Sequence, residues 1–486
     1  MPLILGTNSI KDTGFDVANS LRLNESDDPR LGKSFSSAGN RRTFTQSVWI
    51  KRSKIGVASN FGMYKNEGSG GGNNYLFVGY FDSNDRLYLA RNQSATEVEV
   101  ITTRKFRDVS AWYNIVIAVD TTQGTASNRV KCWVNGVQET SFDSSIYPSQ
   151  NQQFDFNVAQ QHYIGANYNG TSANYDGYMA EFVFVDGTAL DHTSFGEFDS
   201  NSPNIWKPID VADQSITFGT NGFYLDFEDS SALGNDISGQ NNDWTPTNLA
   251  STDQSTDTCT NNFATMNSLA KSLTGTSTFA EGNLKISTNE SQLFGAMSTI
   301  GVTQGKWYVE CKKISQDSGS SDTLSRLSFG VTNNINHSTN NPTTDAGNYY
   351  VYGIQTVYNG GTDLGNLAGT SHIADGKIQM IALDLDNNRV TFGANGQWMD
   401  GSGSYNQSSP SSYVSITDPA DTEAGYFFFQ GDGSISRGYT GEWNFGGTQT
   451  FSISSGNSDG NGYGNFEYAV PSGYYALNSA NLNTYG

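Results

Sequence analysis

Hydrophobic and polar residues alternate in short runs along most of the chain, and this pattern is typical of β-strands. The run from Ile115 to Val119 is continuously apolar, which predicts a strand that is covered on both faces. In residues 130–134 every second position is apolar, which predicts a strand with one buried face. The Asn135-Gly136 pair comes next. It favours a type I′ hairpin turn, because both central positions of that turn need a positive φ.

The same arrangement occurs once more in the second half of the chain. Residues 379–386 form a largely apolar segment, and residues 389–396 repeat the spacing from an Arg-Val pair to an Asn-Gly pair. The sequence thus predicts two strands followed by a tight turn in each half of the chain. We therefore predict an all-β chain of two antiparallel, jelly-roll-like β-sandwich domains in series.

Changes in composition suggest where these domains begin and end. Residues 1–205 are predicted to form the first sandwich together with a polar N-terminal arm. Residues 206–262 are rich in Asn, Asp, Ser, Thr and Gly, which predicts a polar connector with one strand at residues 222–228. Residues 263–486 are predicted to form the second sandwich, and the best candidate for a helix is a short segment at residues 263–273.

The charge balance and the hydropathy exclude some classes of partner. The chain has 27 Lys and Arg residues against 48 Asp and Glu residues, for a net charge of −21. Such an acidic surface repels phosphate backbones, so we expect no nucleic-acid partner. No run approaches the roughly 18 apolar residues of a membrane span, and the first residues lack the basic and apolar regions of a signal peptide. We therefore expect neither membrane insertion nor export through a cleaved leader.

Residue types that commonly carry metal or nucleophilic chemistry are few. The three cysteines and four histidines show no short spacing that would favour a disulfide framework or a zinc site. No P-loop, dinucleotide-binding or nucleophile-elbow motif is present.

Several segments of the first half resemble the laminin-G or concanavalin A-like lectin/glucanase fold. In chain order they are residues 44–51, 112–116, 133–136, 163–165 and 176–182. Segments of the second half resemble a SPRY domain and follow the order of that family. They are residues 305–311, 327–331, 375–386, 390–396 and 426–429. The two resemblances imply a pair of sandwich domains of the kind that bind other molecules.

Other segments resemble bacteriophage structural proteins. They are residues 19–22, 194–197, 241–246, 260–265, 443–446 and 471–482. The combination is similar to tail-fibre and other virion proteins, and it implies a non-enzymatic tail or capsid fibre on the virion surface, made in the host cytoplasm. By this resemblance its partners are other virion subunits and a host cell-surface glycan or protein. The analogy with fibres also implies a homo-oligomer, and specifically a trimer.

Two alternative functions stay open. One is a capsid decoration or tail-assembly protein, and the other is a glycan-cleaving enzyme on a lectin-like fold. Such an enzyme needs two carboxyl groups that face one cleft. Glu181 and Asp186 are five residues apart and point to opposite faces of a regular strand, so this pair requires a bulge. Asp226 and Glu228 share a face but lie in the predicted connector. We therefore predict no catalytic residue and no enzyme activity.

Carbohydrate recognition uses exposed aromatic rings beside polar groups. Candidates in Gly-, Ser- and Asn-rich surroundings are Tyr168, Tyr175, Trp398, Tyr405, Tyr413 and Tyr439. No cofactor is predicted except Ca²⁺, which the resemblance to laminin-G-like domains allows at the sandwich rim through Asp120, Asp176 and Asp186. The alternative is that these three acids are turn residues that bond to their own backbone.

Overall fold

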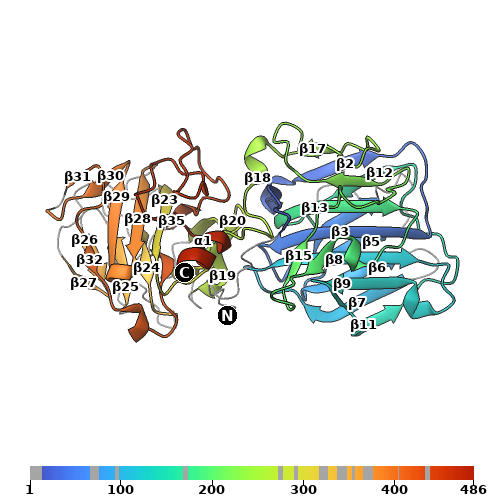
Figure 1. Cartoon of the computed structure of the whole chain (residues 1–486), viewed down its shortest axis with the longest axis horizontal. Coiled ribbons are helices and arrows are strands. Elements are labelled where there is room, and N and C mark those ends of the chain that lie inside the picture. The colour runs from blue at the N-terminus through green and yellow to red at the C-terminus, as the bar shows by residue number, and fades with distance from the viewer. Residues whose placement is uncertain are drawn as a thin grey trace. The chain divides into compact units, whose positions relative to one another are not determined.

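The computed structural model of the chain divides into two compact units, and the division falls between Thr260 and Asn261 (Figure 1). The expected start of the second domain at residue 263 lies close to this division. The residues that the structure describes are 14–65, 76–92, 98–167, 173–271, 277–288, 294–316, 327–335, 347–352, 356–364, 376–402, 404–432 and 438–486. Residues 1–13 of the predicted polar arm lie outside them.

The first unit contains two large antiparallel sheets, A and B. Sheet A has the order β10-β9-β8-β3-β13-β1-β18, and β16 also pairs with β13. Its strands are β1 (Ser20–Leu23), β3 (Thr43–Arg52), β8 (Trp112–Asp120), β9 (Val130–Val134), β10 (Val137–Gln138), β13 (Gly177–Asp186), β16 (Phe223–Leu225) and β18 (Gln254–Ser255).

Sheet B has the order β11-β7-β6-β5-β4-β12-β2-β17. Its strands are β2 (Arg30–Ser34), β4 (Ser59–Lys65), β5 (Leu76–Phe81), β6 (Arg86–Asn92), β7 (Val98–Lys105), β11 (Phe142–Ile146), β12 (Gln161–Ile164) and β17 (Thr245–Thr247). A separate pair consists of β14 (Gly196–Phe198) and β15 (Trp206–Pro208). The described residues of this unit also contain the 3₁₀ turns η2 (Glu25–Asp27), η3 (Ala126–Asn128), η4 (His192–Ser194) and η5 (Ser251–Asp253).

The apolar run in β8 is covered on both faces, as its sequence predicts. Ile115, Ile117 and Val119 lie in the main core with residues of sheet B such as Leu87. The residues between them face the other way and belong to a second cluster with Phe195, Val211 and Phe218. Sheet A is therefore buried by sheet B on one side and by the later part of the unit on the other.

Both predicted Asn-Gly hairpins are confirmed. Asn135 and Gly136 have φ values of 48° and 74°, and Asn395 and Gly396 have 48° and 81°. These left-handed conformations are the ones that a type I′ turn requires. Each turn reverses the chain between a longer strand and a shorter one, from β9 to β10 and from β29 (Arg389–Ala394) to β30 (Gln397–Met399).

Residues 206–260 belong to the first unit, so the prediction of a separate connector with one strand is wrong. Four strands from this stretch pair with earlier ones: β15 with β14, β16 with β13, β17 with β2, and β18 with β1. Asp257 forms an ion pair with Lys51 at 2.7 Å, and both side chains are only 1% exposed. The polar composition reflects closely spaced turns, and strands of two or three residues are too short to show alternation.

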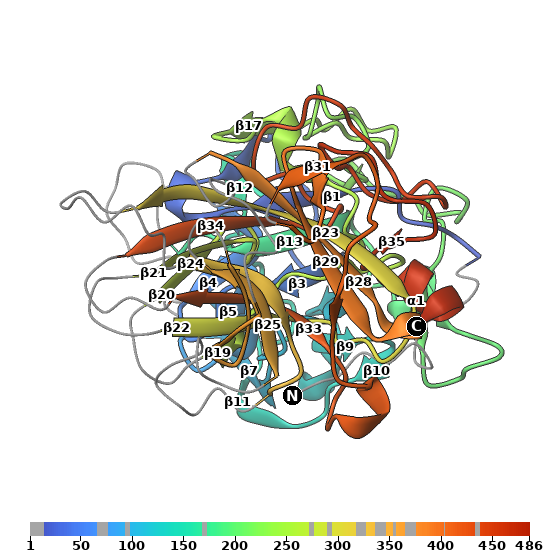
Figure 2. The same ribbon diagram turned by 90° about the vertical axis from the view of Figure 1, so that its left-hand side faces the viewer.

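The second unit also contains two large sheets, C and D; Figure 2 shows the ribbon from the side of this unit. Sheet C consists of β19 (Met266–Lys271), β22 (Phe294–Ser298), β33 (Phe427–Asp432), β24 (Leu327–Thr332), β25 (Asn348–Tyr352), β26 (Thr356–Asn359) and β27 (Thr362–Asp363), in that order. Sheet D runs through β20 (Ser277–Ala280), β21 (Lys285–Thr288), β34 (Tyr439–Asn444), β23 (Lys306–Gln316), β28 (Ile378–Asp384), β29 (Arg389–Ala394), β30 (Gln397–Met399) and β31 (Tyr405–Gln407).

Two short strands extend sheet D, β32 (Val414–Ser415) on β29 and β35 (Tyr475–Ala476) on β23. The turns η6 (Leu385–Asn387) and η7 (Pro419–Asp421) lie between strands. The core between the sheets contains Trp307 and Ile381 from sheet D and Phe329 and Phe428 from sheet C. The described residues thus form a second β-sandwich, in agreement with the predicted all-β fold.

The prediction of a helix at residues 263–273 is wrong, because this segment contains β19. Met266 of that strand is fully buried and pairs with Ser298 of β22, so tertiary pairing overrides the local preference. The described residues instead contain the helix α1 (Ser479–Tyr485), which the side chain of Asn478 caps at the backbone nitrogen of Asn481. No helix among the described residues has the length and apolar character needed to span a bilayer.

Candidate functional site

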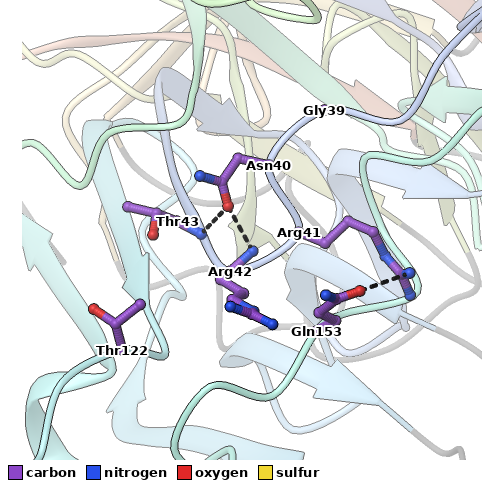
Figure 3. Close-up of a pocket in the computed structure, with 7 residues that line it drawn as sticks. All are labelled: Gly39, Asn40, Arg41, Arg42, Thr43, Thr122 and Gln153. Carbon is purple, nitrogen blue, oxygen red and sulfur yellow. Dashed lines mark hydrogen bonds between the residues drawn. The ribbon is translucent and has the colours of Figure 1, made fainter.

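A polar pocket lies where the strands β8, β3 and β13 of sheet A reach one edge of the first unit. The register pairs Thr43 with Asp120 and Phe44 with Asp186, so these strand ends are neighbours. The loop before β3 contributes most of the wall, and two later loops complete it. The cavity of about 390 Å³, which we call the rim pocket, is lined by Gly39, Asn40, Arg41, Arg42, Thr43, Thr122 and Gln153 (Figure 3).

A buried network holds the loop that forms this wall. The carboxylate of Asp186 accepts hydrogen bonds from the backbone nitrogen of Asn40 at 2.6 Å and from Nδ2 of Asn157 at 2.7 Å. It also accepts one from the backbone nitrogen of Asn221 at 3.1 Å. Gly39 packs directly on the network, and a Cβ there would lie 2.4 Å from Oδ2 of Asp186. The network therefore requires glycine at this point and fixes the loop before β3.

The two arginines of the rim pocket differ in how far they are engaged. Arg41 donates to the carbonyl of Phe154 at 2.6 Å, to Oε1 of Gln153 at 3.1 Å and to Asp155 at 2.9 Å. The guanidinium of Arg42 has no hydrogen bond or ion pair within the described residues, and its Nε is buried. Buried donors without a partner are rare in folded proteins. The Arg42 guanidinium is thus available to a bound molecule.

The other polar groups of the rim pocket are mostly held in place by the backbone. Oδ1 of Asn40 accepts from the backbone nitrogens of Arg42 at 2.9 Å and Thr43 at 3.0 Å (Figure 3). Within the described residues, Nδ2 of Asn40 and Nε2 of Gln153 donate no hydrogen bond. None of the seven lining residues carries a carboxylate, an imidazole or a thiol. The pocket is therefore suited to holding a ligand rich in oxygen acceptors, whereas it lacks a general acid or base.

The three aspartates predicted for Ca²⁺ do not meet at one point. Asp120 and Asp186 lie at the same edge of sheet A, whereas Asp176 precedes Gly177 at the other end of β13, about 33 Å away along an extended strand. Burial would raise the pKa of Asp120, but hydrogen bonds from Thr122 and Gln123 lower it overall. Among the described residues no group of three His, Cys, Asp or Glu side chains is placed to hold a metal ion. Ca²⁺ binding stays a prediction.

Three of the six predicted aromatic contacts are buried, so their assignment to an exposed ligand surface is wrong. Tyr175 is inaccessible and its hydroxyl donates to the carbonyl of Lys51 at 3.1 Å. Trp398 and Tyr439 are 3% and 1% exposed and lie in clusters of the second unit. Gly-, Ser- and Asn-rich flanks supply the turns around a strand, and they do not decide which way its side chains point.

The other three candidates have different outcomes. Tyr168 lies outside the described residues. Tyr405 and Tyr413 are half-buried on sheet D or beside it. The guanidinium of Arg389 lies 3.8 Å from the ring centroid of Tyr413, whose hydroxyl donates to the carbonyl of Pro410 at 3.0 Å. A ring already covered by a cation offers at most one face to a ligand.

Glu181 and Asp186, the first pair of carboxyl groups considered for catalysis, have different partners. The bulge that Glu181 needed is present, because the register of β13 shifts between Ala180 and Val183 and Glu181 has a φ of 50°. The bulge turns Glu181 toward the hydroxyl of Tyr224, whereas Asp186 belongs to the buried network that holds the loop before β3. The prediction that Asp226 and Glu228 share a strand face is wrong, because β16 ends at Leu225 and Phe227 is left-handed with a φ of 61°.

Sequence reasoning missed the rim pocket, because its walls come from three loops that are up to about a hundred residues apart. The available signal was the Arg41-Arg42 pair in a strongly acidic chain. Adjacent cations in such a chain indicate a local surface of opposite charge.

Comparison with known proteins places the rim pocket inside a recognised segment. Residues 33–194, a third of the chain, match the family described as the concanavalin A-like lectin/glucanases superfamily, and all seven lining residues lie within that segment. No curated protein matches the chain.

Two solved structures show low-scoring similarity. The SPRY domain of human HERC1 is 12% identical, with a TM-score of 0.28, over 38% of this chain and 99% of that one. The native heptameric SAP-like pentraxin from Limulus polyphemus is 13% identical, with a TM-score of 0.27, over 36% of this chain and 80% of that one. The family match shows that the first unit contains a concanavalin A-like domain.

Proposed function

We propose that the chain is a non-enzymatic binding protein, whose first unit holds a glycan or protein ligand in the rim pocket. The observation that supports this most directly is the Arg42 guanidinium, which lines the cavity without a partner among the described residues. A guanidinium binds carboxylates and other oxygen acceptors through parallel hydrogen bonds. The amide donors of Asn40 and Gln153 on the same wall favour a hydroxyl- or carboxylate-bearing ligand.

The wider role that we propose is attachment of a phage particle to its host. In this proposal the chain is a tail or capsid fibre on the virion surface, assembled as a homo-oligomer with other virion subunits, and it adheres to a cell-surface glycan or protein. The resemblance of several segments to phage structural proteins supports this role. Several copies of a shallow site then reach useful strength by avidity.

Binding to a glycan array and to intact bacterial cells tests the proposal, with the unmodified protein beside Arg42→Gln. We expect Arg42→Gln to weaken binding by at least about tenfold, since it removes a charge-assisted contact worth roughly 1.5–3 kcal/mol. Lys105→Gln is the matched control, because it removes the same charge at an exposed position outside the pocket. We expect this control to bind like the unmodified protein.

Three results would contradict the proposal. The unmodified protein would bind neither the array nor cells, or it would release sugars from a bound glycan. Alternatively, Lys105→Gln would weaken binding as much as Arg42→Gln, in which case net charge and not the rim pocket would explain the attraction.

A further inference from the structure

A second pocket lies on the outer face of sheet B, where β12, β2 and β17 are neighbours. The register aligns Tyr163 with Gly32 and Gly32 with Thr245 across the three strands. Leu31 and Ile164, the next residues on β2 and β12, lie in the main core. Because side chains alternate along a strand, Tyr163, Gly32 and Thr245 lie on the opposite, outward face.

These outward positions surround a cavity of about 520 Å³, which we call the face pocket. It is lined by Arg30, Gly32, Lys33, Ser34, Gln161, Tyr163, Asp243, Thr245 and Thr247. None of these residues lines the rim pocket. A Cβ on Gly32 would lie 2.9 Å from Nε2 of Gln161 and 3.5 Å from the Tyr163 ring. The missing side chain at residue 32 therefore leaves open space beside an aromatic ring.

The groups around this space are arranged as a binding surface. The guanidinium of Arg30 lies 6.0 Å from the ring centroid of Tyr163 and donates to the carbonyl of Asp28 at 3.1 Å. Gln161 is oriented by Ser34, whose hydroxyl donates to Oε1 at 2.5 Å, and by its own bond to the carbonyl of His162 at 3.0 Å. The amide of Gln161 is thus oriented before any ligand arrives.

Several polar groups at the edge of the face pocket keep their capacity for hydrogen bonds. Within the part of the chain that the structure describes, the hydroxyls of Tyr163, Thr245 and Thr247 have no protein partner. Asp243 accepts from the backbone nitrogen of Asp236 at 2.9 Å through Oδ1, and its other oxygen faces no donor among the described residues. Hydroxyl groups that donate and accept, a carboxylate that accepts and a half-buried ring form a set that matches a sugar ring.

We infer that the face pocket is a second carbohydrate-binding site, which takes an uncharged pyranose with the C–H face of its ring against Tyr163. Positive side chains and a carboxylate occur together in the lining, so the pocket does not select a strongly anionic ligand. The sugar hydroxyls bond to Asp243 and to the threonine hydroxyls of β17. Specificity for the sugar arises from the hydroxyl groups of the edge strand β17. This strand comes from the stretch first predicted as a connector.

The two pockets lie close enough for one glycan to use both. The chain leaves the face pocket at Ser34 and enters the rim pocket at Gly39. Five residues span at most about 18 Å even when fully extended. A second site at this distance raises the effective concentration of a branched or extended glycan at the first.

Saturation-transfer NMR and calorimetry with four neutral hexasaccharides test the inference: maltohexaose, cellohexaose, laminarihexaose and mannohexaose. We expect at least one of them to bind the unmodified full-length protein and Tyr163→Ala to weaken that binding by about tenfold or more. Gly32→Ala is a second variant, which fills the open space at the cost of moving the flexible end of Gln161. We expect it to weaken binding several-fold while the thermal midpoint stays close to that of the unmodified protein.

Two controls separate this site from the rim pocket. Tyr80→Ala removes another half-buried tyrosine of sheet B outside the face pocket, and Arg42→Gln alters the rim pocket alone. We expect Tyr80→Ala to bind the neutral sugars normally. We expect Arg42→Gln to weaken their binding less than Tyr163→Ala does, because the rim pocket contributes only through a glycan that reaches both sites. Failure of all four sugars to bind, or normal binding by Tyr163→Ala and Gly32→Ala, would overturn the inference. A loss in Arg42→Gln alone would move the neutral sugar to the rim pocket and leave the proposed function standing.

Discussion

At the scale of single residues, Glu181 shows how one buried carboxyl group makes stability depend on pH. Its side chain lies at the bulge of β13, is 5% exposed and accepts a hydrogen bond from the hydroxyl of Tyr224. Burial raises the pKa of Glu181 to about 8; the bond from Tyr224 opposes this, and the charges of Asp226 and Glu228 add to it. The folded unit therefore holds this carboxyl group protonated at neutral pH, whereas the unfolded chain ionises it above about pH 4.5.

We expect Glu181→Gln to stabilise the first unit at pH 9 but not at pH 4. At pH 4 both states of the unmodified protein hold the proton, so the substitution gains nothing. Between about pH 4.5 and pH 8 the unfolded state releases the proton first, so the unmodified protein loses stability as the pH rises. At about 1.36 kcal/mol per pKa unit, the free energy of unfolding of Glu181→Gln exceeds that of the unmodified protein by a few kcal/mol at pH 9. Denaturant unfolding at pH 4, 6 and 9 measures it, with exposed Glu423→Gln as control, and a pH-independent difference would contradict the argument.

At the scale of elements, the turn between β9 and β10 shows how local and tertiary requirements coincide at one glycine. Gly136 has a φ of 74°, and a Cβ there would lie 2.2 Å from the ring of Trp206 on β15. We expect Gly136→Ala to destabilise the first unit by roughly 2–4 kcal/mol. Alanine is strained in the left-handed backbone conformation, and its Cβ would also clash with the Trp206 ring. Gly124→Ala, in the connection before β9 with open space around it, is expected to be nearly neutral in the same denaturant titration. Equal effects would show that the Trp206 contact is irrelevant.

Elements that depend on nearby residues could be predicted from the sequence, and those that depend on remote partners could not. The run from Ile115 to Val119 and the two Asn-Gly turns carry their own signals, because alternation and positive φ are local properties. Strands β16, β17 and β18 have two or three residues each and exist only through pairing with β13, β2 and β1. Both pockets depend on such remote pairings or on loops. The burial of Trp398 likewise depends on Tyr308 and Phe466, which its own flanks do not reveal.

At the scale of the whole molecule, the position of the division at residue 260 decides which part of the chain is a complete folding unit. A first domain that ended at residue 205, as composition suggested, would lack β15, β16, β17 and β18. It would lose Phe223, Leu225 and Trp244 from the main core and leave the buried ammonium of Lys51 without Asp257. Removing one partner of a buried ion pair alone typically costs about 3–5 kcal/mol.

We expect a fragment of residues 12–260 to unfold cooperatively on heating, and a fragment of residues 12–205 to lack a cooperative transition. The shorter fragment keeps most of both sheets, but it leaves unpaired edges on β13 and β2. It also uncovers the apolar side chains of Val183 and Val185. Calorimetry and amide NMR spectra of the two fragments make the comparison, and Asp257→Asn in the longer fragment isolates the ion pair from the lost core. A dispersed spectrum and a sharp transition for residues 12–205 would show that the sandwich folds without the later strands. The β17 wall of the face pocket would then belong to a part of the chain that folding does not need. If the fragment of residues 12–205 instead fails to fold, as we expect, β17 and the face pocket belong to the folding unit.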